Sequence, residues 1–189
     1  MPLLPSLPKD ALVKDVYPLN AAMFRHWCIV EEGIMRGPSD FTAGEREVMG
    51  AYVSKLNACT YCWSSHSVAA RHLGADPSVI EALLADIDAA PVAAKMKPVY
   101  RYLKKLTETP HKMVQADADA VLDAGWSEQA LHQAIMVCCC YSFMNRLADG
   151  HGLPSDPALF EARGKRHAEE GYVAQYAGET APAAASGAR

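Results

Sequence analysis

Apolar residues recur at intervals of three and four along most of the chain, and this spacing predicts amphipathic helices. The first long helix is expected over residues 20–36, where the repeating apolar positions are Met23, Trp27, Val30 and Ile34. Gly37 and Pro38 end this helix. No stretch alternates apolar and polar residues as a half-buried strand does, so the pattern predicts an all-α fold.

Capping residues and glycines place the other helices. A capping box at residues 42–45 opens a helix that is expected to end at residue 56. Asn57 is expected to cap the next helix, which would hold Cys59 and Cys62 in its first two turns. Pro98 lies inside a later helical range, so a kink or an interruption is expected there. The later helices are predicted over residues 76–86, 92–108, 114–124, 128–149 and 157–176.

Composition divides the chain into three parts. The prolines within residues 1–18 predict an extended N-terminal arm. Residues 19–176 are expected to form a single helical domain, because a chain of 189 residues buries enough surface for an ordinary core. Residues 177–189 are rich in alanine, glycine and serine, and this composition predicts a mobile tail.

The charge and the apolar pattern exclude several classes of partner. The formal net charge is -4 and no basic segment stands out, so neither nucleic acid nor a membrane is expected as a partner. The first ten residues hold no apolar run of signal-peptide length, and no segment approaches the roughly 20 apolar residues of a membrane span. A cytoplasmic location is therefore expected. Since the cytoplasm keeps thiols reduced, a close pair among the six cysteines indicates catalysis or metal binding.

Two cysteines and a histidine are spaced to share one face of a helix. Cys59 and Cys62 are three residues apart, and His66 follows four residues after Cys62. The thiols lie near the predicted helix N-terminus, where the partial positive charge favours thiolate over thiol. The position at the helix N-terminus would lower the pKa of Cys59 more, whereas proximity to His66 would lower the pKa of Cys62 more.

Glu47 is expected to join this group through the tertiary fold. If the two helices reverse direction near residue 57, they run antiparallel and Glu47 lies opposite residue 67, within one turn of His66. A carboxylate that orients an imidazole, which in turn takes a proton from a thiol, is a suitable arrangement for making a nucleophile.

The spacing Glu-x11-Cys-x2-Cys-x3-His resembles the signature of the AhpD alkylhydroperoxidase family, within the carboxymuconolactone decarboxylase superfamily. The surroundings are similar to its peroxidase-related branch, and the resemblance covers roughly residues 20–155. It implies an AhpD-like helical bundle with the active site on a two-helix hairpin. The flanking segments that carry the resemblance are residues 37–39, 44–47, 52–54, 56–57 and 145–149.

The resemblance also implies a role for each residue. Cys62 would be the peroxidatic thiol that becomes a sulfenic acid, and Cys59 would donate a proton and then close a Cys59–Cys62 disulfide. His66 and Glu47 would form the proton relay. The substrate would be a hydroperoxide, the reductant an external dithiol or redox protein, and the assembly a homo-oligomer, either a trimer or a hexamer. No organic cofactor and no metal is implied. The family's type members have a histidine before the second cysteine, where this chain has Tyr61.

Three other functions remain open. A thiol-based redox sensor or disulfide oxidoreductase module with little peroxidase turnover would use the same cysteines, and Tyr61 favours it. A lactone decarboxylase or isomerase could use the same scaffold, although such relatives typically lack the paired cysteines. A structural zinc site needs four ligands, usually as two separated pairs, and the second pair is absent.

Other reactive side chains are expected to be structural. The consecutive cysteines 138–140 point about 100° apart on a helix, so they cannot hold one ion together and are expected to pack in the core. Arg146 and Asp149 are expected to form an ion pair at a helix end. The alternative is that Arg146 or Asn145 organises a subunit interface near the thiols. Trp63 is expected to pack, or to line the peroxide pocket.

Overall fold

The computed structural model describes residues 1–174, in which helices are the only regular secondary structure. The all-α prediction is confirmed. None of these helices is long and apolar enough to cross a bilayer. In chain order they are α1 Val13–Val16, η1 Tyr17–Asn20, α2 Ala21–Arg36, α3 Ala43–Leu56, α4 Thr60–His72, α5 Val79–Ala85, α6 Met96–Glu108, η2 Pro110–Lys112, α7 Gln115–Asp123, α8 Glu128–Gly150 and α9 Pro157–Glu170.

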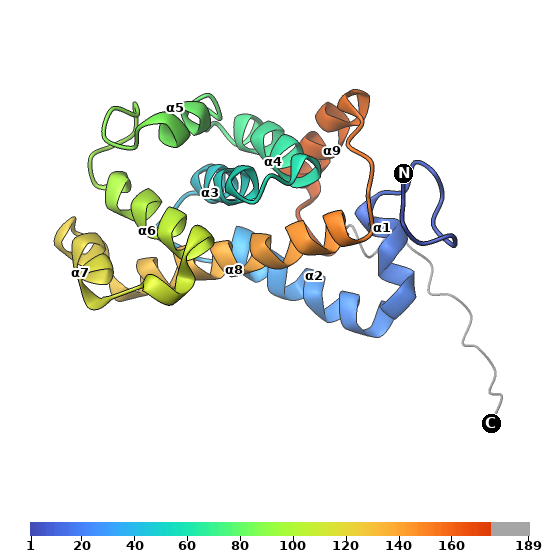
Figure 1. Cartoon of the computed structure of the whole chain (residues 1–189), viewed down its shortest axis with the longest axis horizontal. Coiled ribbons are helices and arrows are strands. Elements are labelled where there is room, and N and C mark those ends of the chain that lie inside the picture. Colours follow the sequence, from blue (N-terminus) through green and yellow to red (C-terminus); the bar gives the residue numbers. More distant parts are fainter. Residues whose placement is uncertain (175–189) are drawn as a thin grey trace.

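Helices α3 and α4 form a hairpin, and the long helix α8 packs along it (Figure 1). In this view α2 lies below α8 and the hairpin lies above it, while α9 turns back to pack against α4. All residues in the range 46–54 of α3 are buried. Polar side chains on this helix are therefore withdrawn from water and need partners inside the protein.

The turn between α3 and α4 corrects the predicted start of the second helix. Asn57 is the C-cap of α3 rather than the N-cap of α4, and Ala58 has φ 57°, in the left-handed region. Cys59 is the N-cap of α4, and its N–H donates to the Ser54 carbonyl at 2.9 Å. A reversal this short needs one left-handed residue, and this displaces the helix start to residue 60. Of the two thiols, only Cys62 lies inside the helix.

Two glycines allow neighbouring helices to approach the hairpin closely. A Cβ atom at Gly50 would lie 2.3 Å from the ring of Tyr141, so α8 can bring this ring against α3 only because position 50 has no side chain. A Cβ atom at Gly164 would lie 2.3 Å from the Cβ atom of Val68, so the same reasoning applies to α9 and α4. Both approaches bring side chains to the buried side of the hairpin.

Several helix ends differ from the predicted ones. Helix α6 begins at Met96 rather than at residue 92, so Pro98 lies in the first turn, where its missing N–H breaks no helical hydrogen bond. The helix then continues to Glu108, and the interruption that was one of the two expectations is absent. Helix α5 begins at Val79, three residues after the Asp76 turn. Helix α9 ends at Glu170, because the next residue is a glycine with φ 69°.

The N-terminal segment is partly helical rather than extended throughout. Residues 13–20 form α1 and η1, and the ring of Tyr17 is buried, with its centroid 4.7 Å from that of Phe24. Apolar burial of this kind outweighs the extended preference of the surrounding prolines. The division into arm, domain and tail stays a prediction. Its last boundary at residue 176 and the tail 177–189 lie outside the described residues.

Candidate active site

Cys59 and Cys62 are adjacent at the start of α4, and both are thiols in this structure. The relative exposure of Cys59 is 0% and that of Cys62 is 4%. A hydrogen bond joins the two thiols. The pair is therefore shielded from solvent and close enough for one sulfur to act on the other.

Asn145 on α8 connects the thiols to the hairpin turn. Its Nδ2 donates to Ser54 Oγ at 2.9 Å, and its Oδ1 accepts from Asn57 Nδ2 at 2.9 Å. Its backbone oxygen lies 3.9 Å from Cys59 Sγ, and its side chain also hydrogen-bonds with Cys62. Asn145 is thus a buried residue beside the sulfurs, whereas the sequence had suggested a role for it at a subunit interface near the thiols.

The expectation that the helix N-terminus favours the thiolate is wrong for Cys62. Its hydrogen bond with Cys59, and then burial, raise the pKa of the Cys62 thiol well above its usual value. The Asn145 side chain and the charge of Arg163 act in the opposite direction. The hydrogen bond with Cys59 and the loss of hydration together therefore outweigh the favourable helix dipole. Forming the thiolate here needs a proton acceptor.

Glu47 and His66 meet across the hairpin. Glu47 Oε2 lies 2.7 Å from His66 Nδ1, and the relative exposures of these residues are 0% and 6%. This contact agrees with the antiparallel geometry expected from the sequence. His66 lies one helical turn beyond Cys62 on α4, so a carboxylate, an imidazole and a thiol follow one another in the buried centre.

Glu47 is held as a carboxylate by partners on every side. Arg36 Nη2 donates to Glu47 Oε1 at 2.6 Å, and the Tyr172 hydroxyl donates to the same oxygen at 2.7 Å. Burial alone would raise the pKa of Glu47, but the interactions with His66 and Arg36 outweigh it and lower the pKa to about 2. A second bond from Arg36 Nη2 to the His167 carbonyl at 2.9 Å fixes the guanidinium in place. The carboxylate is therefore charged at every physiological pH.

Two tyrosines complete the network around His66. The Tyr141 hydroxyl lies 3.0 Å from His66 Nδ1 and 3.1 Å from the Tyr172 hydroxyl. Burial raises the pKa of both hydroxyls well above their usual value, so both keep their protons. The consistent assignment is that Tyr141 donates to Tyr172, Tyr172 donates to Glu47, and the His66 Nδ1–H donates to Glu47. In the neutral form of His66, Nε2 is then the nitrogen without a proton and can act as a base.

Helix α9 covers this network from the outside. The imidazole of His167 stacks on that of His66, with centroids 5.1 Å apart. Burial, followed by the charge of His66, lowers the pKa of His167 well below its usual value, so this ring is neutral. A narrow cavity of about 40 Å³ remains between α9 and the N-terminal segment, and its lining includes Tyr61 and Arg163.

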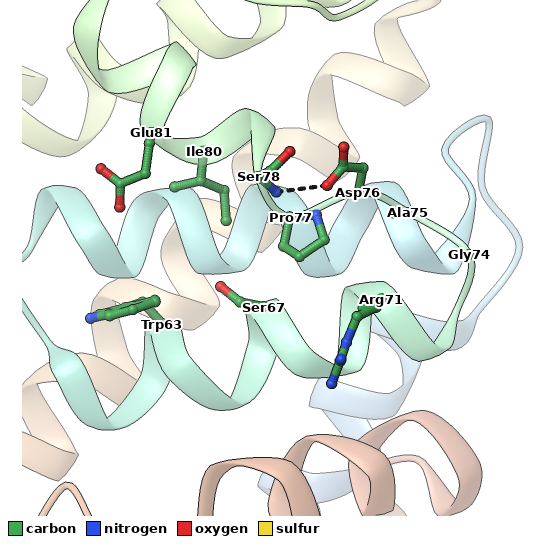
Figure 2. Close-up of a pocket in the computed structure, with 10 residues that line it drawn as sticks. All are labelled: Trp63, Ser67, Arg71, Gly74, Ala75, Asp76, Pro77, Ser78, Ile80 and Glu81. Carbon is green, nitrogen blue, oxygen red and sulfur yellow. Dashed lines mark hydrogen bonds between the residues drawn. The ribbon is translucent and has the colours of Figure 1, made fainter. Parts of the chain in front are cut away.

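The large surface groove lies on a different face of α4 from the thiols. Its volume is about 610 Å³, and Figure 2 shows it between α4 and the segment that leads into α5. Trp63, Ser67 and Arg71 line it at four-residue spacing, while neither Cys62 nor His66 does. Trp63 therefore belongs to this groove, with Lys55 Nζ 3.8 Å from its ring centroid, and does not line a cavity beside the sulfurs.

Two further sequence expectations need correction. Cys138 and Cys140 are buried as expected, but Cys139 is exposed, because the 100° turn per residue points it away from the core. The expected ion pair of Arg146 and Asp149 is absent from the described part of the chain. Arg146 Nη1 instead donates to the Ser142 carbonyl at 2.7 Å.

No group of three or more histidine, cysteine, aspartate or glutamate side chains within residues 1–174 is arranged to hold a metal ion. The zinc alternative, which needs a closed set of such ligands, therefore finds no support in the described residues.

Arg36, Tyr141, His167 and Tyr172 join the site although the sequence analysis did not select them. They come from α2, α8, α9 and the segment after α9, and helical periodicity gives no relative register between separate helices. One usable signal was Gly50, since a glycine inside a helix often marks a close approach by another element. It would have indicated a bulky residue packed against α3 near Glu47.

A second buried carboxyl group lies on α2. The relative exposure of Glu31 is 3%, and burial, together with the nearby Glu47 charge, raises its pKa to about 8. Its folded pKa exceeds the unfolded value of 4.5, so wild-type stability falls as pH rises from 4.5 to 8. Between pH 5 and pH 8 we expect Glu31→Gln to gain about 4 kcal/mol of unfolding free energy relative to wild type. Urea unfolding at both pH values measures this difference, and parallel changes in the two proteins would refute it.

Comparison with known proteins agrees with this architecture. Residues 21–105 match the carboxymuconolactone decarboxylase family. This segment belongs to that family. It contains Glu47, Cys59, Cys62 and His66, and the resemblance inferred from the sequence is confirmed. No curated protein matches the chain.

Two solved structures share the fold of this chain. One is described as an uncharacterized peroxidase-related protein from Silicibacter sp. TM1040, with TM-score 0.71, 23% identity, and coverage of 80% of this chain and 79% of that one. The other is described as an alkylhydroperoxidase AhpD core, an uncharacterized peroxidase-related protein from Ralstonia eutropha JMP134. It has TM-score 0.69, 20% identity, and coverage of 79% and 78%. The AhpD-like helical fold is thus confirmed.

Proposed function

We propose that this protein is a thiol-dependent peroxidase that reduces hydroperoxides through a Cys59/Cys62 dithiol–disulfide cycle. The observation that carries the proposal is the buried Glu47–His66 contact of 2.7 Å, one helical turn from a pair of hydrogen-bonded thiols. A buried carboxylate that fixes the tautomer of an imidazole beside a thiol of raised pKa is the arrangement that nucleophile activation requires. The names of the two similar structures point in the same direction.

The chemistry balances with these residues and one external reductant. Nε2 of His66 takes the Cys62 proton, and the thiolate attacks the outer oxygen of the hydroperoxide, which breaks the O–O bond. The products are Cys62 sulfenic acid and an alcohol, whose oxygen receives a proton. The Cys59 thiol then attacks the sulfenic sulfur, which forms the disulfide and releases water. An external dithiol reduces the disulfide and becomes a disulfide itself.

A redox sensor is the second candidate. The observations that favour it are the burial of both sulfurs and the raised pKa of Cys62, since both slow the reaction with peroxide. Tyr61 also replaces the histidine that the resemblance would place there. A sensor needs to be oxidised only once per signal, so low turnover would not harm it.

Turnover separates the two functions. Reduced protein at catalytic concentration is mixed with an alkyl hydroperoxide and excess dithiothreitol, and hydroperoxide loss is compared with that in dithiothreitol alone. The peroxidase proposal predicts many equivalents consumed per protein. Consumption of one equivalent, with formation of one disulfide, would instead identify a sensor. No disulfide at all would contradict both.

We further propose that the chain works as a homo-oligomer in a reducing compartment such as the cytoplasm. Large apolar side chains on and just before α2 are exposed, and contact with another subunit would bury them. Light scattering after size exclusion tests this, and a trimer or hexamer is the expected result. The exposed residues concerned are Leu19, Met23, Ile29 and Val30.

A further inference from the structure

Arg163 on α9 is a largely buried cation that has no carboxylate partner among residues 1–174. Every ion pair of residues 1–174 joins other side chains, and Arg163 takes part in none of them. Its Nη1 atom is buried and has no hydrogen-bond partner among the described residues. A buried charge without a counter-ion is costly, so its persistence calls for an anion nearby.

The guanidinium is held at the residue that precedes the peroxidatic cysteine. Arg163 Nη2 donates to the Tyr61 carbonyl at 2.9 Å, and its Cζ atom lies 3.6 Å from the centroid of the Tyr61 ring. The Tyr61 hydroxyl accepts from the Val13 N–H at 2.8 Å, which fixes the ring from its other end. Gly164, the next residue along, allows α9 to come this close to α4. The position of the charge is therefore determined by packing on two sides.

Few groups near Arg163 can become its counter-ion. Tyr61 keeps its proton, because burial raises the pKa of its hydroxyl to about 12. The Glu47 carboxylate already forms an ion pair with Arg36 and a hydrogen bond with His66. The thiols remain, and the Arg163 charge lowers the pKa of Cys62. The titratable and charged groups around the start of α4 also include Lys14 and Asp15 on α1 and Arg166 on α9, besides Cys59, Tyr61, His66, Glu47, Arg163 and His167. The Asp15 carboxylate is already paired with Lys14 and accepts from the Leu12 N–H.

We propose that Arg163 is a positioning residue whose guanidinium, which has no carboxylate partner among residues 1–174, is the counter-cation of the Cys62 thiolate. The inference rests on the proposed function in that it concerns the same sulfur. Arg163 lies on α9, outside the segment 21–105 that matches the family. The positive charge therefore comes from a helix that the family match does not include. Proton transfer from Cys62 to His66 leaves a negative charge on the sulfur. The Arg163 guanidinium is already in position, so it stabilises this charge without a rearrangement of the surrounding side chains. The role accounts for a thiol that can ionise in spite of its burial.

The test measures the thiolate without any peroxide. The rate of Cys62 alkylation by iodoacetamide is followed against pH in wild type, Arg163→Gln, Arg163→Lys and Lys165→Gln, with tandem mass spectrometry locating the adduct. Lys165→Gln is the matched control, because it removes an exposed charge from the same helix. Circular dichroism confirms that each variant is folded. For Arg163→Gln we expect the apparent pKa of Cys62 to rise by about one unit, which slows alkylation at pH 7 about tenfold.

Arg163→Lys keeps the charge, and its rate is expected to stay within about threefold of the wild-type rate. An unchanged pH profile in Arg163→Gln overturns the proposal. Equal shifts in Arg163→Gln and Arg163→Lys, or a shift in Lys165→Gln, also overturn it, because they indicate a packing effect. If the predicted shifts occur while wild type fails to turn over peroxide, the proposed function fails and the counter-cation assignment stands.

Discussion

Replacing Cys62 by serine is expected to abolish peroxide reduction, with a rate loss on the order of 10³-fold or more. Serine has nearly the same volume, so the fold should survive with a cost of about 1–2 kcal/mol for the buried hydroxyl. Its hydroxyl does not attack the O–O bond, and no sulfenic acid can form at this position. Hydroperoxide loss in the presence of a dithiol measures the effect.

Cys59→Ser should behave differently from Cys62→Ser. The Cys62 sulfur remains, so one equivalent of hydroperoxide is still consumed, but the disulfide cannot close and turnover by the dithiol slows. Cys139→Ser is the matched control, because it removes an exposed thiol on α8. Equal peroxide consumption by wild type and Cys62→Ser would show that the assignment of the peroxidatic thiol is wrong.

Replacing Glu47 by glutamine is expected to damage both stability and activity. The Arg36 guanidinium would lose its carboxylate inside the core, and breaking a buried ion pair in this way costs about 3–5 kcal/mol. The same change removes the negative charge beside Nδ1 of His66 and leaves one acceptor oxygen where Arg36, Tyr172 and His66 share two. Loss of a positioned proton relay typically lowers the rate by about 10²–10⁴-fold. Urea unfolding and hydroperoxide consumption at pH 7 measure the two effects.

The pH dependence of the unfolding free energy tests independently whether Glu47 is held as a carboxylate. Its pKa is about 2 in the folded protein, against an unperturbed value of 4.5 in the unfolded chain, so it stabilises the fold above pH 4.5. This contribution, about 3 kcal/mol, is lost as pH falls from 4.5 through 2. Glu47→Gln should lack this acid-dependent loss. Glu81→Gln, at an exposed salt bridge with Lys55, is the control and should change stability by less than about 0.5 kcal/mol. A Glu47→Gln protein as stable and as active as wild type would contradict the relay.

The sequence was sufficient to predict the helical hairpin and the meeting of Glu47 with His66. Apolar residues spaced by three and four, together with the capping box, define α3. The chain reverses direction near residue 57, so residues at equal distances before and after the turn, such as Glu47 and His66, lie opposite each other. The error of two residues at the start of α4 arose because Asn57 is equally suited to capping a helix at either end. Cys59 was consequently assigned to the helix rather than to its cap.

The rest of the site depends on packing between distant segments. Tyr141, Arg163 and Tyr172 reach the hairpin from α8, α9 and the segment that follows α9, and side-chain periodicity does not specify which residues of separate helices meet. The raised pKa of Cys62 has this origin only in part. Its largest cause is the hydrogen bond with Cys59, three residues away, and burial by other elements, which the local sequence does not reveal, adds to it.

The central claim is that Cys62 is the sulfur that peroxide oxidises. The direct measurement is to treat Cys59→Ser protein with one equivalent of an alkyl hydroperoxide and dimedone, and to locate the sulfenic acid adduct by peptide mass mapping. The account predicts an adduct on Cys62, formed before any on the exposed Cys139. An adduct on Cys139 alone, or none on Cys62, would contradict it.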